Sequence, residues 1–225
     1  MHLTMRMILR CLWIERPNPA FLTIETGYEA SFLSADELRR YAADPAYDLP
    51  PAFVDREVAL GHRCLAIRQG DVLASYGWYC TTPARFTDKL WVHFDNEWVY
   101  MHKGFTHAAH RGRRLHAIGM SLALTAYIAH GYRGLVTIVA ADNRASLASC
   151  ARMGYRRFGT IYTARAGRLI AVQDPPDWLD RTFVVSTPGC RAFGFRLDRS
   201  RETSPLAAPH RPDATTVDLT FQRRS

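Results

Sequence analysis

The sequence lacks several patterns that identify whole classes of protein. Its five cysteines are widely spaced and odd in number, and no two of them form a CxxC pair. They therefore predict neither a disulfide framework nor a zinc site, and we expect most of them to be small buried hydrophobic residues. The chain also contains no internal repeat.

Long apolar runs are missing as well. None approaches the ~20 consecutive residues of a membrane-spanning helix. The apolar residues from Met5 to Ile14 resemble a signal peptide, but Arg10 interrupts them and no small-residue cleavage site precedes Glu15. We therefore expect a soluble, cytoplasmic protein without a membrane span.

Acidic residues are the scarcer charge. There are 21 of them against 29 lysines and arginines, which gives a net charge of +8. This balance favours an anionic partner: nucleic acid, a membrane surface, an acidic carrier protein or a phosphorylated cofactor. Much of the excess is clustered, which suits a local phosphate site at least as well as a broad nucleic-acid surface. The clustered residues are Arg111, Arg113, Arg114, Arg152, Arg156 and Arg157.

The 225 residues, 48% hydrophobic and 22% charged, are typical of a globular protein of one domain. We expect that domain to cover residues 1–198. From residue 199 the chain is rich in Pro, Arg, Ser and Thr, which predicts a flexible tail over 199–225.

The first half of the chain predicts two helices and a hairpin. Ser34 and Glu37 match a capping box, which predicts a helix from there to about Ala43. A second helix is expected over residues 52–60, with Gly61 as its stop. Residues 64–81 resemble a hairpin that turns at residues 69–71.

The second half predicts strands that alternate with helices. Strands are expected at 98–105, 135–140, 155–162 and 169–172, and helices at 113–130 and 144–153. Asn143 is suited to cap the second of these helices, and Gly154 to close it. This order indicates an α/β architecture around a mixed sheet.

The turn between the strand at 98–105 and the following helix carries the clearest functional signal. It contains Arg111, Gly112, Arg113 and Arg114, directly before the helix. Helix N-termini offer unpaired backbone N–H groups and a partial positive charge, and arginine matches phosphate oxygens with a planar fork. The turn therefore predicts a phosphate site.

Residues 98–162 resemble the GCN5-related N-acetyltransferase (GNAT) superfamily, whose phosphate turn commonly reads Arg-Gly-x-Gly-Leu-Gly. Arg111, Gly112 and Leu115 fit this pattern, whereas Arg114 and His116 occupy its later small positions. Asn143 and Gly154-Tyr155 fit the family's Asn…Gly-Phe signature, with Tyr for Phe. The resemblance implies a mixed, mostly antiparallel sheet flanked by helices, with a splayed central strand pair.

The resemblance also implies the ligand and its contacts. Backbone N–H groups of residues 112–115 would hold the pyrophosphate of acetyl-CoA or another acyl-CoA. The strand end at Phe105 and Thr106 would bind the pantetheine arm and polarise the thioester carbonyl, and Asn143 would bond the pantetheine region. We expect the side chains of Arg114 and His116 to point outward, onto phosphate.

Three residues are candidates for proton transfer. A general base on the strand that faces the acceptor is expected at Glu97 or His102, of which His102 has the more suitable ordinary pKa. Cys150 stands where the family often has the tyrosine that protonates the leaving thiolate; simple packing, a water or Tyr155 are the alternatives. The spacing of His102, His107, His110 and His116 matches no metal motif, so we expect no metal.

These observations favour an acyl-CoA-dependent N-acyltransferase that acts on a small amine-bearing acceptor in a ternary complex. Two alternatives stay open. One keeps the fold but takes the acyl group from an acyl-carrier protein, and the other is a non-catalytic protein that binds coenzyme A or nucleic acid. Nucleic acid is the less favoured partner, and the acceptor and the oligomeric state are not readable from the sequence.

Overall fold

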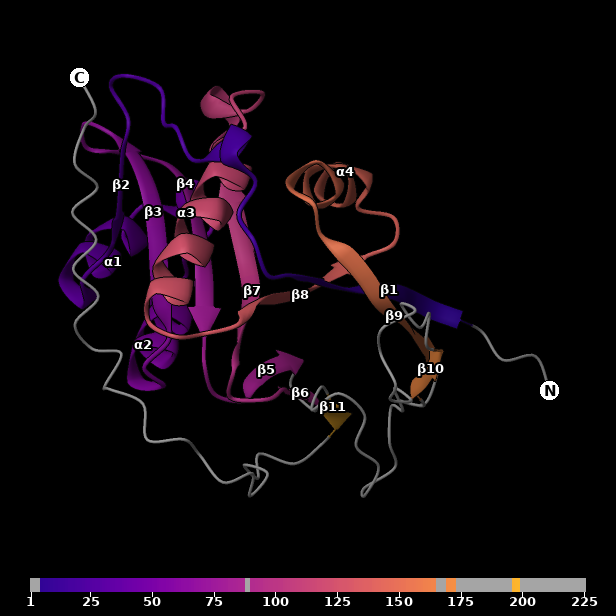
Figure 1. Ribbon diagram of the computed structural model, residues 1–225. Helices are drawn as coiled ribbons and strands as arrows, with labels where there is room; N and C mark the ends of the chain where they lie inside the picture. Colours follow the sequence, from indigo (N-terminus) through magenta and orange to yellow (C-terminus); the bar gives the residue numbers. More distant parts are fainter. Residues whose placement is uncertain (1–4, 88–89, 165–168, 173–195, 199–225) are drawn as a thin grey trace. The chain divides into compact units, whose positions relative to one another are not determined.

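The computed structural model describes residues 5–87, 90–164, 169–172 and 196–198 (Figure 1). They divide into two compact units, each assembled from segments that are distant in the sequence. The first unit lies within residues 1–15, 81–100 and 132–209, and the second within 16–80 and 101–131. One domain over residues 1–198 stays a prediction, and the expected tail at 199–225 lies outside the described residues.

The first unit is built mainly from antiparallel strands. Its elements are β1 (Met5–Ile14), β5 (Ala84–Thr87), β6 (Leu90–His93), β8 (Gly134–Ala140), α4 (Arg144–Met153), β9 (Arg156–Ala164), β10 (Leu169–Val172) and β11 (Arg196–Asp198). Four strands pair in the order β10-β9-β1-β8, and β1 is antiparallel to both of its neighbours. A separate small sheet has the antiparallel order β11-β6-β5.

Strands β1, β5, β6 and β11 of this unit were not predicted from the sequence, and β1 is the longest of them. Its apolar residues serve the core: Cys11 is fully buried, and Trp13 meets Trp98 edge-on at 5.9 Å between ring centroids. A central strand paired on both sides is apolar on both faces. This is why residues 5–14 resemble a leader segment in the sequence alone.

The second unit holds a sheet between helices. Its elements are the short 3-10 helices η1 (Pro19–Phe21), η2 (Pro45–Tyr47) and η3 (Ala108–His110), the strands β2 (Glu29–Phe32), β3 (Arg63–Gln69), β4 (Val72–Cys80) and β7 (Trp98–Thr106), and the helices α1 (Ala35–Ala42), α2 (Pro51–Ala59) and α3 (Leu115–Ala129). The strand order is β7-β4-β3-β2. The first residues of β7, up to Tyr100, belong to the first unit. The predicted α/β class is confirmed, with a mostly antiparallel sheet and four α-helices in the described residues.

Strand β3 shows how this sheet is covered on both faces. Cys64 and Ala66 pack in a cluster with residues of α1 and α2, whereas Leu65 and Ile67 lie against Gly119 of α3. Successive side chains of a strand point to opposite faces, so the helix pair and α3 cover the two sides (Figure 1). Both faces are shielded from water, which explains why the middle of β3 and most of β4 are apolar and buried.

The local signals in the sequence hold in the structure. Ser34 and Glu37 form the capping box of α1, with the Ser34 backbone N–H donating to the Glu37 carboxylate at 2.8 Å. Gly70 turns the β3–β4 hairpin with a φ of +57°, and Gly154 ends α4 with a φ of +98°. The capping box acts through hydrogen bonds between near neighbours and the glycines act through their backbone conformation, so neither depends on the rest of the fold.

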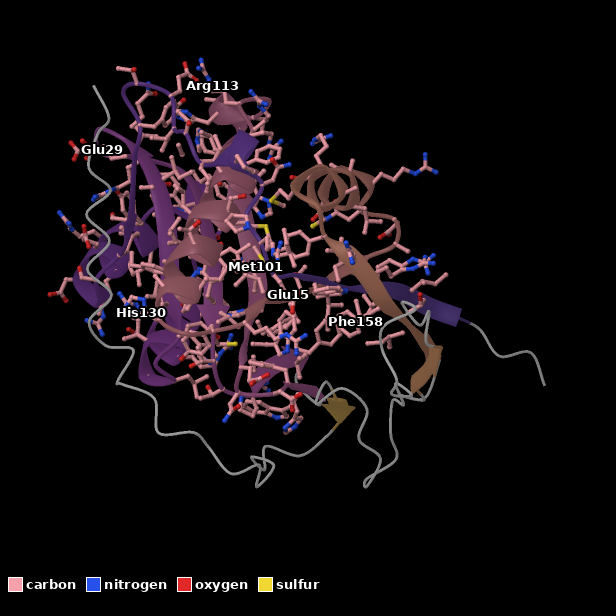
Figure 2. The ribbon with its side chains drawn as sticks, viewed as in Figure 1. Glu15, Glu29, Met101, Arg113, His130 and Phe158 are labelled. Carbon is pink, nitrogen blue, oxygen red and sulfur yellow. The ribbon has the colours of Figure 1, made fainter. Side chains whose placement is uncertain are left out.

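Helix α3 is the central helix of the second unit. Eleven of its fifteen residues are buried, as expected of a helix that is apolar nearly all round. In Figure 2, Arg113 and His130 mark the residues just beyond its two ends. Among the described residues, no helix is both long and apolar enough to cross a membrane.

Two glycines, Gly134 in the first unit and Gly119 in the second, test the packing within each unit. A Cβ at Gly134 would overlap the Ile14 carbonyl oxygen and lie 2.8 Å from the Trp98 ring. We expect Gly134→Ala to lower the free energy of unfolding by about 2–3 kcal/mol, measured by urea titration. Gly119→Ala is the matched control, because its Cβ meets only ordinary contacts from 3.5 Å and gains helix propensity of about 0.5–1 kcal/mol. Equal losses in both variants would contradict this packing.

Candidate functional site

The Arg-Gly turn (residues 111–116) connects β7 and η3 to α3 through two left-handed residues. Gly112 has a φ of +84° and Arg114 a φ of +60°. Arg114 is one of only two non-glycine residues with positive φ among those described, and this conformation costs free energy in a residue with a Cβ. Left-handed residues within a turn allow successive N–H groups to converge into a concave anion-binding nest.

The backbone N–H groups of residues 112–117, here called the N–H cluster, are the main feature of the site. The first backbone bond of α3 runs from the Ile118 N–H to the Arg114 carbonyl, and no side chain caps the helix. Within the described part of the chain, none of the N–H groups of the cluster donates a hydrogen bond. Such donors need an acceptor from outside, and the partial positive charge of the helix start favours an anion.

The three arginines of the turn differ in their surroundings. Arg113 donates to both carboxylate oxygens of Glu25 at 2.9 and 3.1 Å, so its charge is already paired. The Arg114 guanidinium lies 6.0 Å from the centre of the Phe21 ring, and the Arg111 Nε donates weakly to the Thr106 carbonyl at 3.4 Å. Neither Arg111 nor Arg114 forms an ion pair in the described ranges, which leaves two cations beside the N–H cluster.

A loop that the sequence did not single out supports the turn. It runs from Phe21, the last residue of η1, to Tyr28. Phe21 lies under Arg114 and Glu25 pairs with Arg113 in the turn, and Tyr28 contacts His110 directly before the turn. The Tyr28 hydroxyl and the His110 Nδ1 are 2.8 Å apart. These contacts hold the Arg-Gly turn in place through residues that belong to no sequence motif.

The expectation for the His116 side chain was wrong. Its ring turns back onto the strand, where a Cβ at Gly104 would overlap the His116 Nε2. There it lines a cavity of about 10 Å³ together with Ser75 of β4 and Met120 of α3, which is room for about one water. Burial lowers the pKa of His116 to about 4, so the ring is neutral at pH 7. Only the backbone N–H of His116 remains available to a phosphate.

The end of β7 is held by Ser75. The Ser75 hydroxyl donates to the Phe105 carbonyl at 2.8 Å and lies 3.0 Å from the Thr106 hydroxyl. The His107 N–H donates to the Ala74 carbonyl at 2.9 Å, and the Phe105 ring stacks on Tyr76 at 5.4 Å. The strand end expected to bind pantetheine is thereby fixed directly before the Arg-Gly turn, and its binding role stays a prediction.

His102 lies in a buried polar group that the sequence did not reveal. Glu57 of α2 accepts a hydrogen bond from the His62 Nδ1 at 2.6 Å, and its Oε2 lies 3.5 Å from the His102 Nε2. Burial alone would raise the pKa of Glu57, but the His62 hydrogen bond and the charge of neighbouring groups lower it overall. Burial lowers the pKa of His102 to about 4, against the opposing effect of Glu57.

The first unit contains the other three predicted site residues. Glu97 is exposed in the turn before β7, where its carbonyl accepts from the Arg133 N–H at 2.7 Å. Asn143 caps α4, since its Oδ1 accepts from the Ser146 N–H at 3.1 Å. Burial raises the pKa of the Cys150 thiol to about 11, which makes it a weaker acid than an ordinary thiol and favours packing. The functional roles of these residues stay predictions.

The second unit therefore brings together most of the predicted site. It contains His102, the strand end and the complete Arg-Gly turn, whose Leu115 is buried as the first residue of α3. Glu57 and His62, which the prediction missed, precede His102 by 45 and 40 residues. Only their position in the fold identifies them, because neither the helix nor the loop that holds them contains a motif.

The buried ring of His116 should make the stability of the protein depend on pH. The unfolded chain protonates this imidazole near pH 6.5 and the folded chain near 4, so between these values the unfolded state binds more protons. The stability is complete above pH 6.5 and falls on acidification by up to about 1.4 kcal/mol per pH unit. In urea titrations from pH 7 to 4.5, we expect His116→Asn to lose stability less steeply than the wild type. Equal slopes would contradict the buried neutral ring.

Comparison with protein-family models and with curated proteins finds no match for this sequence. Solved structures do match. A tandem GNAT protein from the clavulanic acid biosynthesis pathway, determined without acetyl-CoA, aligns with a TM-score of 0.50 and 17% identity over 72% of this chain and 55% of that one. A GCN5-related N-acetyltransferase from Sphaerobacter thermophilus aligns with a TM-score of 0.49 and 13% identity over 77% of this chain and 54% of that one.

The chain spans about half the length of these two proteins. At such low identity the likeness concerns the fold alone. It agrees with the resemblance carried by the Arg-Gly turn, by Asn143 and by Gly154-Tyr155. The chain has the fold of the GCN5-related N-acetyltransferases.

Proposed function

We propose that the chain is an acyl-CoA-dependent N-acyltransferase that transfers an acetyl group to a small amine-bearing acceptor. The observation that carries this proposal is the N–H cluster of residues 112–117, in a fold shared with a tandem GNAT protein. The cluster has no acceptor within the described chain, and two unpaired arginines flank it. A pyrophosphate supplies the negative oxygens that such donors require.

The residues of the turn divide the binding of the donor between them. The backbone N–H groups from Gly112 to Ala117 hold the pyrophosphate, and Arg111 and Arg114 add charge-assisted hydrogen bonds. Arg113 acts differently, because its ion pair with Glu25 anchors the neighbouring loop. Phe105 and Thr106 then receive the pantetheine arm along the strand end that Ser75 fixes.

In the transfer itself, the acceptor nitrogen attacks the thioester carbonyl, the C–N bond forms and the C–S bond breaks. His102 takes the proton from the acceptor nitrogen, since its neutral ring predominates at pH 7. The Glu57 carboxylate, 3.5 Å from the His102 Nε2, stabilises the imidazolium that results. The leaving thiolate takes a proton from water, because the Cys150 thiol is too weak an acid to supply it readily.

The alternative donor is an acyl-carrier protein. The observation that favours it is the net charge of +8, because carrier proteins are acidic. Such a donor presents a single phosphate on its pantetheine arm, which the same N–H cluster would bind. The two donors would therefore bind their phosphate groups at the same N–H cluster, and they differ in what is attached to the phosphate: the rest of coenzyme A or a carrier protein.

Calorimetry separates these possibilities. We expect acetyl-CoA to bind the wild type with a dissociation constant below the millimolar range. Arg111→Ala/Arg114→Ala should weaken binding by about 10- to 100-fold, since a hydrogen bond to a charged group contributes about 1.5–3 kcal/mol when buried and less when exposed. The matched control is Arg39→Ala/Arg40→Ala on α1, which removes the same charge from an exposed helix.

The outcomes are distinct. An equal loss in both double variants would show that net charge alone matters and would contradict the assigned phosphate site. The absence of heat with the wild type at sub-millimolar acetyl-CoA would exclude it as the donor. If an acylated acyl-carrier protein binds instead and the Arg111/Arg114 variant weakens that binding, the alternative donor is correct.

A further inference from the structure

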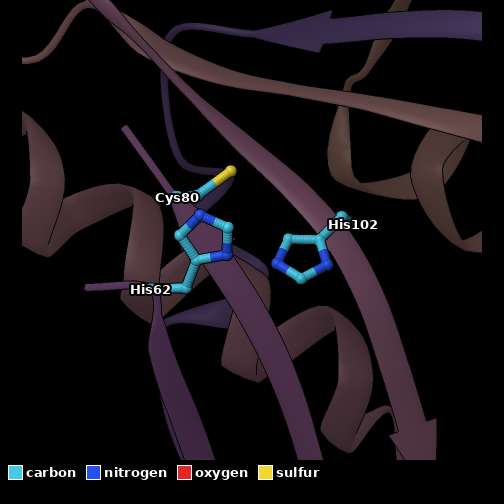
Figure 3. Close-up of side chains that lie close together, drawn as sticks. All are labelled: His62, Cys80 and His102. Carbon is cyan, nitrogen blue, oxygen red and sulfur yellow. The ribbon is translucent and has the colours of Figure 1, made fainter. Parts of the chain in front are cut away.

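Three side chains from separate elements converge near the strands β4 and β7. His62 precedes β3, Cys80 is the last residue of β4, and His102 lies in β7. Their potential ligand atoms all lie within 4.8 Å of one another, and Figure 3 shows the three side chains close together. The His62 and His102 rings are 5.3 Å apart between centroids. These three residues, here called the His-Cys-His cluster, all belong to the second unit.

Burial of the cluster is nearly complete. The side chain of His62 is 2% exposed and that of His102 is 9% exposed, and Cys80 is buried as well. Imidazole and thiol groups in such a place are removed from bulk water. Their chemistry is therefore decided by one another and by whatever ligand they enclose.

The surroundings of the two His62 ring nitrogens suit a metal ligand. Its Nδ1 faces the Glu57 Oε2 at 2.6 Å, so with an ionised carboxylate the proton lies on Nδ1 and the lone pair on Nε2. Within the described residues this Nε2 is buried and has no hydrogen-bond partner. A carboxylate that holds one imidazole nitrogen while the other binds a metal is a recurring arrangement in zinc proteins.

The donor set determines the kind of ion. Two imidazoles and one thiolate suit Zn²⁺ or Co²⁺, whereas Mg²⁺ and Ca²⁺ prefer oxygen. With zinc bonds of about 2.0–2.3 Å, tetrahedral ligand atoms are about 3.3–3.7 Å apart. The limit of 4.8 Å thus leaves at most about 1.1–1.5 Å to be closed, which is within the reach of small side-chain rotations.

We propose that His62, Cys80 and His102 bind a transition-metal ion, Zn²⁺ or its analogue Co²⁺, with Glu57 orienting His62. The Cys80 thiol releases its proton to solvent on binding, and the fourth position is left to water or an exogenous ligand. The proposal rests on the His-Cys-His cluster alone and does not depend on the acyl donor. A metal-bound His102 nitrogen does not accept a proton, so the proton transfer assigned to His102 belongs to the metal-free chain, and bound metal should slow the acyl transfer.

Cobalt titration tests the site directly. The full chain, free of any affinity tag and treated with chelator, is titrated with Co²⁺ and followed by absorption. We expect one equivalent to produce a thiolate-to-cobalt charge-transfer band in the near ultraviolet and the intense visible bands of tetrahedral Co²⁺. Zn²⁺ should abolish both by displacement, and Mg²⁺ should leave them unchanged.

Matched cysteine variants identify the ligand. Cys80→Ser should lose the charge-transfer band, whereas Cys64→Ser, a buried cysteine on the adjacent strand β3, should retain it. Circular dichroism of each metal-free variant checks that it folds. Glu57→Gln should keep the band and weaken Zn²⁺ binding by about 10- to 100-fold, as expected for a residue that orients a ligand.

A second measurement uses only the unaltered chain. At a hundredfold excess of free Zn²⁺ over its dissociation constant, we expect the Tm of the wild type to rise by about 5–10 °C, and an equal concentration of Mg²⁺ to leave it unchanged. The proposal is overturned if the wild type gives no charge-transfer band, if Cys80→Ser retains it, or if both ions shift the Tm equally. None of these results bears on acetyl-CoA binding, so the two proposals fail separately.

Discussion

The proposed chemistry depends on backbone N–H groups at the start of α3 that have no partner among the residues the structure describes. A helix start normally satisfies these donors with a side-chain cap, as Ser34 does in α1 and Asn143 in α4. The start of α3 has Arg114 at the cap position in a left-handed conformation that offers no side-chain acceptor. This choice costs stability locally, and it leaves a place for an anion.

The surrounding packing keeps that place in shape. Ser75 fixes the end of β7, and Gly104 leaves room for the His116 ring beneath the turn. The loop after η1 contributes Glu25, which pairs with Arg113. Because each contact joins the turn to a different element, the N–H cluster is positioned before any ligand arrives, which lowers the entropy cost of binding.

Local signals in the sequence predicted the elements well. The capping box at Ser34, the turn at Gly70 and the end of α4 at Gly154 each depend on a few neighbouring residues, so they are readable without the fold. Strand β1 was not predicted, because a strand buried on both sides has no alternation and resembles other apolar segments. The phosphate site at the Arg-Gly turn was predicted from the residues of the turn alone, and it stays a prediction.

The details of the site depend on tertiary contacts and were not readable. The direction of the His116 ring follows from the missing side chain at Gly104, twelve residues earlier. Glu57 and His62 lie 5 residues apart, but Cys80 and His102 follow them by 18 to 45 residues, so only the packing of α2 against the sheet brings the four side chains together. Both proposed sites belong to the second unit: the anion site at the Arg-Gly turn and the metal site at the His-Cys-His cluster.

The most direct test of the central claim is amide NMR of the chain during titration with acetyl-CoA. Hydrogen bonds to phosphate oxygens move the amide proton resonances of the donors downfield. We predict that the largest downfield shifts belong to residues 112–117, at the start of α3. Saturating acetyl-CoA that leaves these amides unshifted, or that moves mainly amides elsewhere, would contradict the account.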